Sequence, residues 1–451
     1  MTSISELNIG AIEILYLVII FIVGFTFTLL IIPYIAKIMK KHGFVGIDIH
    51  KNARPAIAES GGLSIVLGLL LSSVVLILFF PTLMNEIIVF ILTVIICGII
   101  GFIDDRIKLR SIFKILLTIF TGSAFFLANY FGFITIQSPT VPFLGITRLT
   151  LIYPLATPII VAVFANTSNM LEGYNGEGSG TSLIALTFLL ICAVLWNSAE
   201  AFLICLSAIA VITPFFLYNK FPAKIFPGDV GTLSIGAIFA SIALLGSLEV
   251  AVFCALLIHI TNSFFVIRSL RGFFESSEIQ EKKSDIRLLP DDRIEASGKK
   301  DAALSFPRLI LAKGPLTEPQ LVKNFYAISV ICGFFSIIAI MFMLWTIGSY
   351  YLAFLIIWII ILSIPTIMLL YLFPRIRGII ILMILLMVIM CLVLIFIDSV
   401  IMRYFQGDFE LFFIDIPYNI LFSFILVIPA LAIWYYLTLR YFWIQIKRMK
   451  N

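Results

Sequence analysis

The chain has 451 residues, of which 62% are hydrophobic and only 12% are charged, and its formal net charge is +5. Soluble proteins average about 45–50% apolar and about 25% charged residues, so this composition excludes an ordinary soluble protein. Apolar runs of about 18 or more residues predict membrane-spanning helices, and the sequence contains about thirteen of them. We therefore predict an all-α, polytopic integral membrane protein.

The predicted spans follow one another along the whole chain. The first ten residues, MTSISELNIG, contain no basic residue and no small-residue cleavage site, so we expect an uncleaved first helix rather than a signal peptide. The approximate cores of the spans are 11–35, 62–80, 86–103, 112–131, 148–167, 181–197, 200–218, 231–246, 248–268, 325–347, 350–373, 378–399 and 417–442.

The connections between the spans fall into two classes. Those after the second, fourth, sixth and eighth spans contain almost no Lys or Arg. The connections after the odd-numbered spans are the ones that carry basic residues. Because basic residues mark the cytoplasmic side, we expect these connections and the C-terminus to be cytoplasmic and the N-terminus to be outside. The membrane would be an archaeal-type plasma membrane or an ER-type membrane. The cytoplasmic class is long and charged, or rich in Gly and Asn: 36–61, 104–111, 168–180, 219–230 and 269–324.

Two adjacent acids end the third span, in IIGFIDDRIKLR (99–110). Asp104 and Asp105 would lie at a helix C-terminus, where the helix dipole disfavours acids by about 0.3–1 kcal/mol. One interpretation is an interfacial salt-bridge cluster with Arg106, Lys108 and Lys114. The other is that the acids face a metal–phosphate assembly or a nucleophile.

The segment ANTSNMLEGYNGEGSG (165–180) leaves the fifth span. Asn166 and Asn169 are spaced i, i+3, so both amides would lie on one face of a helix. Either this segment is a flexible turn with Asn caps, or its glycines permit a close approach to a ligand. Those glycines are Gly173, Gly176, Gly178 and Gly180.

The segment KIFPGDVGTLSIGA (224–237) places Asp229 directly before the eighth span. Asp229 could simply be an N-cap, which is a common position for Asp. A helix N-terminus is also a ready phosphate site, where Asp229 could serve a metal. The link 46–62, with Asp48, Lys51, Arg54 and Glu59, could be no more than a solvated connection.

Carboxylates and amides on one face, without a His/Cys cluster, favour a hard cation that prefers oxygen ligands. Mg²⁺ is the first choice because it keeps water ligands and bridges substrate phosphates, and Mn²⁺ is the alternative. Nearby Lys and Arg side chains would complete a phosphate clamp.

These four segments, in this order, resemble motifs of the polyprenyl-phosphate N-acetylhexosamine-1-phosphate transferases, over roughly residues 10–347. GFIDDRIKLRSIFK is similar to the aspartate-pair loop, NTSNMLEGYNG to the Asn-Gly loop and FPGDVGTLSIG to the Gly-Asp motif. AIAESGG resembles the Glu-Ser-x-Gly of the dolichyl-phosphate UDP-GlcNAc branch. The resemblance implies transfer of GlcNAc-1-phosphate from UDP-GlcNAc to a polyprenyl or dolichyl phosphate, with release of UMP.

The resemblance also implies roles for individual residues. Asn169 and Asp229 match the family's metal ligands, Asp104 and Asp105 its essential pair, and Lys114 a basic residue beside the phosphates. We expect Asp104 to align the nucleophile or accept a proton, and Asp105 to serve the metal's outer shell or Lys114. The expected substrate contacts are Glu59, Lys108, Asn166, Gly173, Asn175, Arg287 and Arg293, with Arg308 as a further phosphate candidate.

The family core of ten helices would correspond to residues 1–347 with the cytoplasmic loop 269–324. Residues 348–451 would add about three spans that the resemblance leaves unexplained. The expected partners are UDP-GlcNAc, the lipid phosphate, the membrane and, as an open alternative, a second copy of the chain, but not nucleic acid. Three functional alternatives stay open: another UDP-N-acetyl sugar, an undecaprenyl-type lipid, or a transporter or flippase.

Overall fold

The computed structural model describes residues 2–7, 10–147, 152–270, 279, 283–299, 301–405, 407–411 and 414–448. A helix lies at each of the thirteen predicted spans, so the prediction of an all-α, polytopic membrane protein is confirmed. The helices of the first ten spans are α1 (Ala11–Lys41), α2 (Leu63–Phe79), α3 (Met84–Ile107), α4 (Ser111–Tyr130), α5 (Ile152–Leu171), α6 (Glu177–Trp196), α7 (Ala199–Asn219), α8 (Gly228–Gly246), α9 (Glu249–Ala255) with α10 (Leu257–Leu270), and α13 (Glu318–Thr346).

The last three spans are α14 (Leu352–Leu372), α15 (Arg377–Phe396) and α17 (Tyr418–Arg448). Short elements connect the spans: α12 (Phe306–Leu311), α16 (Met402–Tyr404), the 3-10 helices at Ile4–Leu7 and Pro81–Leu83, and a π-helical turn at Ile397–Ile401. The strands are β1 (Val45–Ile47), β2 (Ala56–Ala58), β3 (Thr140–Val141), β4 (Gly145–Ile146), β5 (Ile286–Leu288), β6 (Arg293–Ala296), β7 (Leu316–Thr317), β8 (Asp408–Leu411) and β9 (Ile414–Pro417).

The ninth predicted span, 248–268, consists of two helices rather than one. It is broken between α9 and α10, which meet at an angle of 69°. The break at Leu256 contains neither proline nor glycine, so the hydropathy of the segment gave no sign of it. The bend turns α10 away from the direction of α9, and a cavity described below lies against both helices.

The core is centred on α8, which packs against α3, α5 and α7. Every residue from Val230 to Gly246 is buried. Small residues allow these close contacts, as is usual between membrane helices. A Cβ on Gly236 would lie only 2.3 Å from the Cα of Ala165 in α5, so glycine is required there. A fully enclosed α8 provides a rigid base for its first turn, which carries Asp229.

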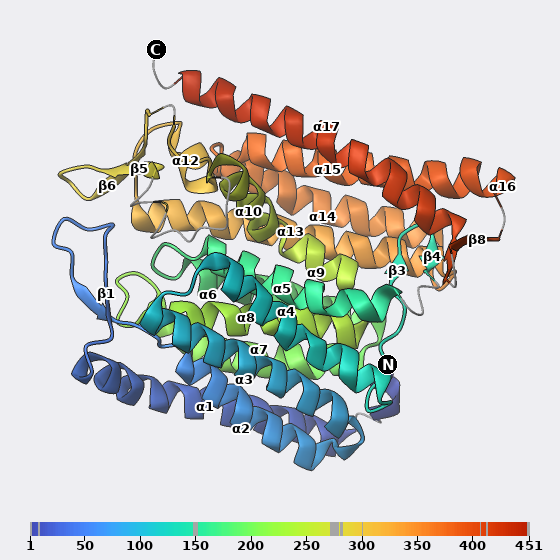
Figure 1. Cartoon of the computed structure of the whole chain (residues 1–451), viewed down its shortest axis with the longest axis horizontal. Coiled ribbons are helices and arrows are strands. Elements are labelled where there is room, and N and C mark those ends of the chain that lie inside the picture. The colour runs from blue at the N-terminus through green and yellow to red at the C-terminus, as the bar shows by residue number, and fades with distance from the viewer. Residues whose placement is uncertain are drawn as a thin grey trace.

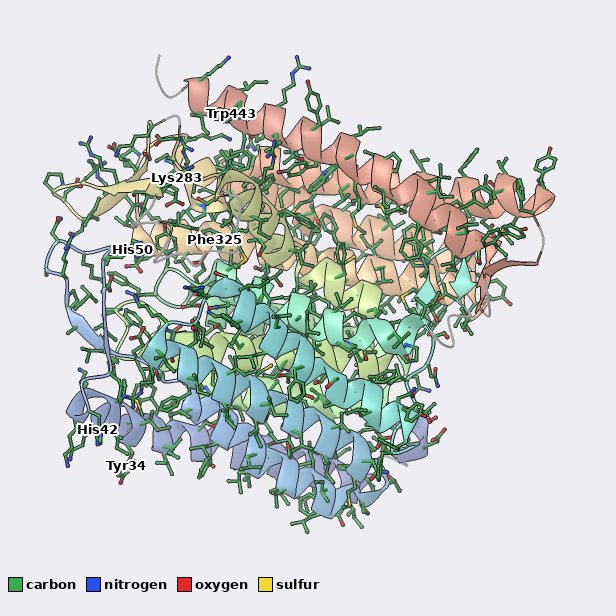
Figure 2. All side chains as sticks on the ribbon, viewed as in Figure 1. Tyr34, His42, His50, Lys283, Phe325 and Trp443 are labelled. Atoms are coloured by element: carbon green, nitrogen blue, oxygen red, sulfur yellow. The ribbon has the colours of Figure 1, made fainter. Side chains whose placement is uncertain are left out.

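Figure 1 shows the long helices side by side, with β1, β5 and β6 at one end and β3, β4 and β8 at the other. Helix α1 begins at one end of the molecule and α17 finishes at the other. Figure 2 places His42, His50 and Lys283 at the end that carries β1 and β5. Hydrogen bonds between residues of the connections 36–61, 104–111, 168–180, 219–230 and the segment 269–324 confirm that these polar segments share one face.

Candidate active site

Lys114 joins two of the predicted motifs through their carboxylates. It lies in the first turn of α4 and is only 5% exposed. Its Nζ donates to Oδ2 of Asp104, at the end of α3, and to Oδ2 of Asp229, in the first turn of α8, at 2.5 Å. A buried cation between two carboxylates balances part of their charge, so this cluster combines α3, α4 and α8 into one electrostatic unit.

Asp105 has a different task from its neighbour. Its two carboxylate oxygens accept hydrogen bonds from the Ser60 hydroxyl, at 2.6 Å, and from the backbone N–H of Asp229, at 2.7 Å. It therefore satisfies a free N–H at the start of α8 from a neighbouring helix, where the helix dipole favours an anion. The prediction that Asp105 serves Lys114 is wrong, because Lys114 pairs with Asp104 and Asp229.

Glycines bring the backbones of this cluster together. Gly228 begins α8 with a φ of +62°, and a Cβ there would lie 2.4 Å from Oδ2 of Asp105. A Cβ on Gly101 of α3 would lie 2.3 Å from the carbonyl oxygen of Asp229. The N-cap interpretation of Asp229 is also corrected, because α8 begins at Gly228 after Pro227, so Asp229 lies inside the first turn.

A polar cavity of about 180 Å³ opens beside the first turn of α8. Asn169 contributes to its wall from the last turn of α5, and its Oδ1 accepts a hydrogen bond from the Thr232 hydroxyl at 2.9 Å. Three connections, 36–61, 168–180 and 219–230, thus bring oxygen ligands and backbone groups to one space. The lining residues are Ile47, Asp48, Ile49, His50, Glu59, Asn169, Glu172, Gly173, Tyr174, Asn175, Phe226, Pro227, Gly228, Asp229 and Thr232.

On the side of the polar cavity lined by Asp48 and Asn175, contacts join residues that are distant in the sequence, although Lys51 and Glu318 do not themselves line it. Asn175 donates from its backbone to Glu318, at 2.7 Å, and from its side chain to Asp48, at 3.1 Å. The ammonium of Lys51 lies against Asp48 and 3.8 Å from Glu318. The His50 ring stacks on Tyr174 with centroids 4.3 Å apart, and it and Asp48 are buried.

The link 46–62 is thus more than a solvated connection. Within the described part of the chain, Asp48, His50 and Glu318 also form a group whose ligand atoms lie within 4.8 Å of one another. The ammonium of Lys51 already lies beside the two carboxylates of this group, those of Asp48 and Glu318. The sequence analysis did not assign Glu318 to the site. Glu318 belongs to none of the four motifs, and its contact with Asn175 joins residues that are 143 positions apart.

His50 and Glu172, which both line the polar cavity, have displaced pKa values. Burial lowers the pKa of His50 to about 4, with Lys51 acting in the same direction and Asp48 opposing it. Burial raises the pKa of Glu172 to about 8. His50 is therefore a neutral imidazole and Glu172 largely a neutral carboxylic acid near pH 7, and neither adds charge to the polar cavity there.

Several predicted substrate contacts lie elsewhere. Lys108 is exposed at the C-cap of α3, with a φ of +46°. Arg287 and Arg293 are exposed on β5 and β6, where they pair with Glu295 and Asp291. The proposal of Arg308 as a phosphate contact is wrong, because its guanidinium N–H groups all donate to backbone carbonyls, those of Ser297, Lys299, Ala302 and Ala303.

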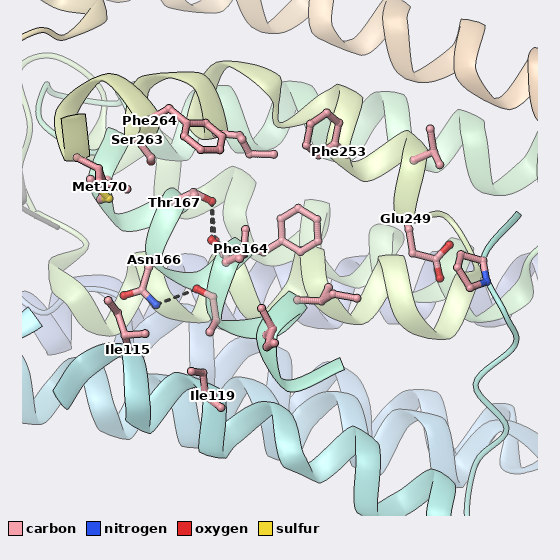
Figure 3. Close-up of a pocket in the computed structure, with 18 of the residues that line it drawn as sticks. Ile115, Ile119, Phe164, Asn166, Thr167, Met170, Glu249, Phe253, Ser263 and Phe264 are labelled. Carbon is pink, nitrogen blue, oxygen red and sulfur yellow. Dashed lines mark hydrogen bonds between the residues drawn. The ribbon is translucent and has the colours of Figure 1, made fainter. Parts of the chain in front are cut away.

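Asn166 does not share the environment of Asn169. Its amide donates to the Thr118 hydroxyl, at 2.9 Å, and to the carbonyl of Ala162, at 2.8 Å. It lies at the wall of a second, apolar cavity of about 680 Å³ between α4, α5, α9 and α10. Figure 3 shows this cavity extending from Met170 and Ser263 at one end to Glu249 at the other.

The apolar cavity begins next to the charged cluster. Ile115, which follows Lys114 directly, lines it from α4, and Met170, which follows Asn169, lines it from α5. Its wall is otherwise mostly aliphatic and aromatic. A polar cavity and a long apolar cavity that begin at the same helix ends suit an amphiphilic ligand with a charged head and a hydrocarbon tail.

Comparisons with known proteins agree with this architecture. A family model described as glycosyl transferase family 4 matches residues 87–247. The chain is 30% identical over 320 residues to a provisionally named glycosyltransferase of Methanocaldococcus jannaschii, covering 71% of the chain and 94% of that relative. It is 29% identical over 322 residues, with the same coverage, to a Saccharolobus solfataricus protein provisionally named UDP-N-acetylglucosamine–dolichyl-phosphate N-acetylglucosaminephosphotransferase.

A bacterial relative is the phospho-N-acetylmuramoyl-pentapeptide-transferase of Staphylococcus aureus, 29% identical over 224 residues, which covers 47% of this chain and 70% of that protein. The fold, the clustered motifs and these relatives define a transferase embedded in the membrane. The chain belongs to glycosyl transferase family 4, among the polyprenyl-phosphate sugar-phosphate transferases.

Proposed function

We propose that this protein transfers N-acetylglucosamine-1-phosphate from UDP-GlcNAc to a polyprenyl phosphate of the dolichyl type. The observation that carries the proposal is the charged cluster of Lys114, Asp104 and Asp229, which stands between the polar cavity and the start of the apolar cavity. The names of the archaeal relatives support the choice of sugar and lipid. The product would begin a lipid-linked oligosaccharide for protein N-glycosylation.

In the proposed reaction, an oxygen of the lipid phosphate attacks the β-phosphorus of UDP-GlcNAc, and the bond from that phosphorus to UMP breaks. A phosphate monoester is largely dianionic at pH 7, since its second pKa is about 6, so strong base catalysis is not required. The protein must instead neutralise charge and align the reactants. Lys114 supplies the fixed positive charge, and Asp105 fixes the first turn of α8 on which Asp229 stands.

The donor set at the polar cavity fits Mg²⁺. Asn169 and Asp229 offer an amide and a carboxylate oxygen on the same cavity wall, and Mg²⁺ needs only one or two such ligands beside water and phosphate. When bound, the ion would neutralise the diphosphate and stabilise UMP as a leaving group. Glu59, Gly173 and Asn175 would contact the nucleotide from the opposite part of that wall.

We further propose that residues 1–347 form the catalytic core and that residues 348–451 are an extension, in a membrane whose cytoplasmic face carries the site. A different UDP-N-acetyl sugar or an undecaprenyl phosphate would use the same chemistry and is the closest alternative. A transporter would hold its charged groups near the middle of the membrane. Here the acids cluster at helix ends, which favours the transferase.

The test is release of UMP by purified protein in detergent with Mg²⁺, dolichyl phosphate and UDP-GlcNAc. UMP release that depends on the lipid is expected, together with its loss on chelation and in Asp229→Ala. Asp301→Ala is the matched control, because Asp301 is exposed and lines neither cavity. Absence of UMP with every UDP-N-acetyl sugar tried, from folded protein, would overturn the proposal.

A further inference from the structure

Besides the polar cavity and the apolar cavity of about 680 Å³, a third cavity, also apolar and of about 360 Å³, lies where residues 348–451 pack on the core. Helices α9 and α13 and the β3–β4 hairpin form one side of it, and α15 and α17 form the other. The residues from the extension are Met387, Met390, Cys391, Leu394, Ile420, Ser423, Phe424, Val427 and Ile428. We call this space the extension cavity.

The extension cavity continues the apolar cavity that starts beside Lys114. Four residues line both spaces: Pro139, Val141, Val250 and Phe253. The first cavity touches α5 from Met170 back to Tyr153, a stretch that rises about 25 Å at 1.5 Å per residue. A hydrocarbon chain that starts at the charged cluster therefore reaches the junction after it has passed most of the membrane's apolar layer, which is about 30 Å thick.

The extension is firmly packed against the core rather than loosely attached. The ring centroid of Phe442 in α17 lies 4.7 Å from that of Phe265 in core helix α10, and within the extension the Trp434 indole of α17 donates to the carbonyl of Leu382 in α15 at 2.7 Å. Arg375 donates to the carbonyl of Gly314 at 2.6 Å. The wall that α15 and α17 present to the extension cavity is thus held in place at both helices.

We propose that the extension cavity binds the distal isoprene units of the acceptor lipid, so that residues 348–451 set a preference for long polyprenyl phosphates. The inference rests on the proposed function. The support for it is that the two apolar cavities are continuous. The extension cavity begins where a long tail in the first apolar cavity would otherwise leave the protein, so it suits the rest of that tail. Half-buried Met387 and Met390 have the flexible side chains that adapt to an irregular hydrocarbon.

The experiment compares two acceptors, farnesyl phosphate and dolichyl phosphate, in the UMP assay. Met390→Trp fills the extension cavity from α15, and Ser423→Phe fills it from α17. Each is expected to lower kcat/KM for dolichyl phosphate about tenfold, mainly by raising KM, while the value for farnesyl phosphate stays unchanged. Leu392→Trp is the control, because Leu392 is 61% exposed on the same helix and does not line the cavity.

The outcomes separate the two proposals. If the unsubstituted protein turns over neither acceptor, the proposed function fails, and with it this inference. If it turns over both, but the cavity-filling variants lose activity equally with both acceptors or keep the dolichyl preference of the unsubstituted protein, the extension cavity does not hold the tail. Retained turnover of farnesyl phosphate by the same variants shows that they are folded.

Discussion

At the residue scale, Lys114 is the point at which the charges of three helices meet. Lys114→Met would leave the buried Asp104 and its partner Asp229 without their common cation. Removing one member of a buried ion pair costs about 3–5 kcal/mol of stability. Loss of a charge aimed at a transferring phosphoryl group costs about 10²–10³ in rate. We therefore expect UMP release to fall at least about 100-fold and the thermal unfolding midpoint to fall as well.

Lys114→Arg is the matched control for this prediction. It keeps the positive charge and should hold both carboxylates, so the unfolding midpoint should stay close to that of the unsubstituted protein. Activity would still fall, because the larger guanidinium alters the geometry beside the phosphates. Unchanged activity in Lys114→Met would remove Lys114 from the proposed mechanism.

The second residue-scale prediction concerns His50, whose pKa is lowered by burial from 6.5 to about 4. Between those values the unfolded chain binds a proton that the folded protein does not, so stability falls as the pH is lowered. The effect should be absent above pH 6.5, should grow as pH falls to about 4, and would total about 3 kcal/mol.

His50→Phe isolates this contribution, since it keeps an aromatic ring against Tyr174 but binds no proton. The measurement is the unfolding midpoint in detergent across this pH range for both proteins. The two proteins differ only at residue 50, so the difference between the two curves reports on His50. Parallel curves would mean that His50 is not buried as a neutral ring.

At the element scale, the site depends on how closely α3 approaches α8. Gly101→Ala would place a Cβ 2.3 Å from the carbonyl oxygen of Asp229, so one of the two helices must move. Overpacking of this kind costs about 1–3 kcal/mol, and the first turn of α8 would shift with Asp229. We expect UMP release to fall at least about tenfold.

Gly298→Ala is the control for the glycine prediction, because a Cβ there meets no atom within 4 Å. Activity and the thermal unfolding midpoint should both be unchanged in that variant. Normal activity in Gly101→Ala would show that the spacing of α3 and α8 tolerates more displacement than the structure implies.

Hydropathy alone was sufficient to predict the helices, but it could not predict the break between α9 and α10. The helices at the predicted spans follow from the need to satisfy backbone groups inside the membrane, and each apolar run shows this need in the local sequence. The residues at Leu256 are as apolar as their neighbours, so that bend depends on tertiary packing. For the same reason the extension cavity has no signature in either α15 or α17 taken separately.

Some residues of the site could be predicted from the sequence and others could not. Asp104, Asp229 and Lys114 were identified from motifs that a resemblance made interpretable, and the structure brings them into direct contact. Asn166 was grouped with Asn169 by helical spacing, yet the two side chains line different cavities. Glu318 was missed, because a contact with Asn175 across 143 residues leaves no trace in local sequence.

At the scale of the whole molecule, the polar connections share one face, and their charge predicts which face that is. Residues at this end are rich in Lys and Arg, which marks the cytoplasmic side. A UDP-sugar is highly charged and does not cross an apolar layer unaided, so a site that uses it must face the compartment that holds it. The basic residues in question are Lys37, Lys40, Lys41, Lys51, Arg54, Arg106, Lys108, Arg110, Lys220 and Lys224.

This orientation is testable by thiol labelling, because the natural cysteines are buried, apart from Cys391, which is half-buried in α15. Lys299→Cys introduces an exposed thiol in the segment beside β6, and Phe133→Cys introduces one in the connection after α4, where Phe133 is 62% exposed. In inside-out vesicles, a membrane-impermeant maleimide should label Lys299→Cys and spare Phe133→Cys, and in right-side-out vesicles the pattern should invert. The reverse pattern would put the polar cavity outside the cell, away from cytoplasmic nucleotide sugars, and would contradict both the orientation and the proposed donor.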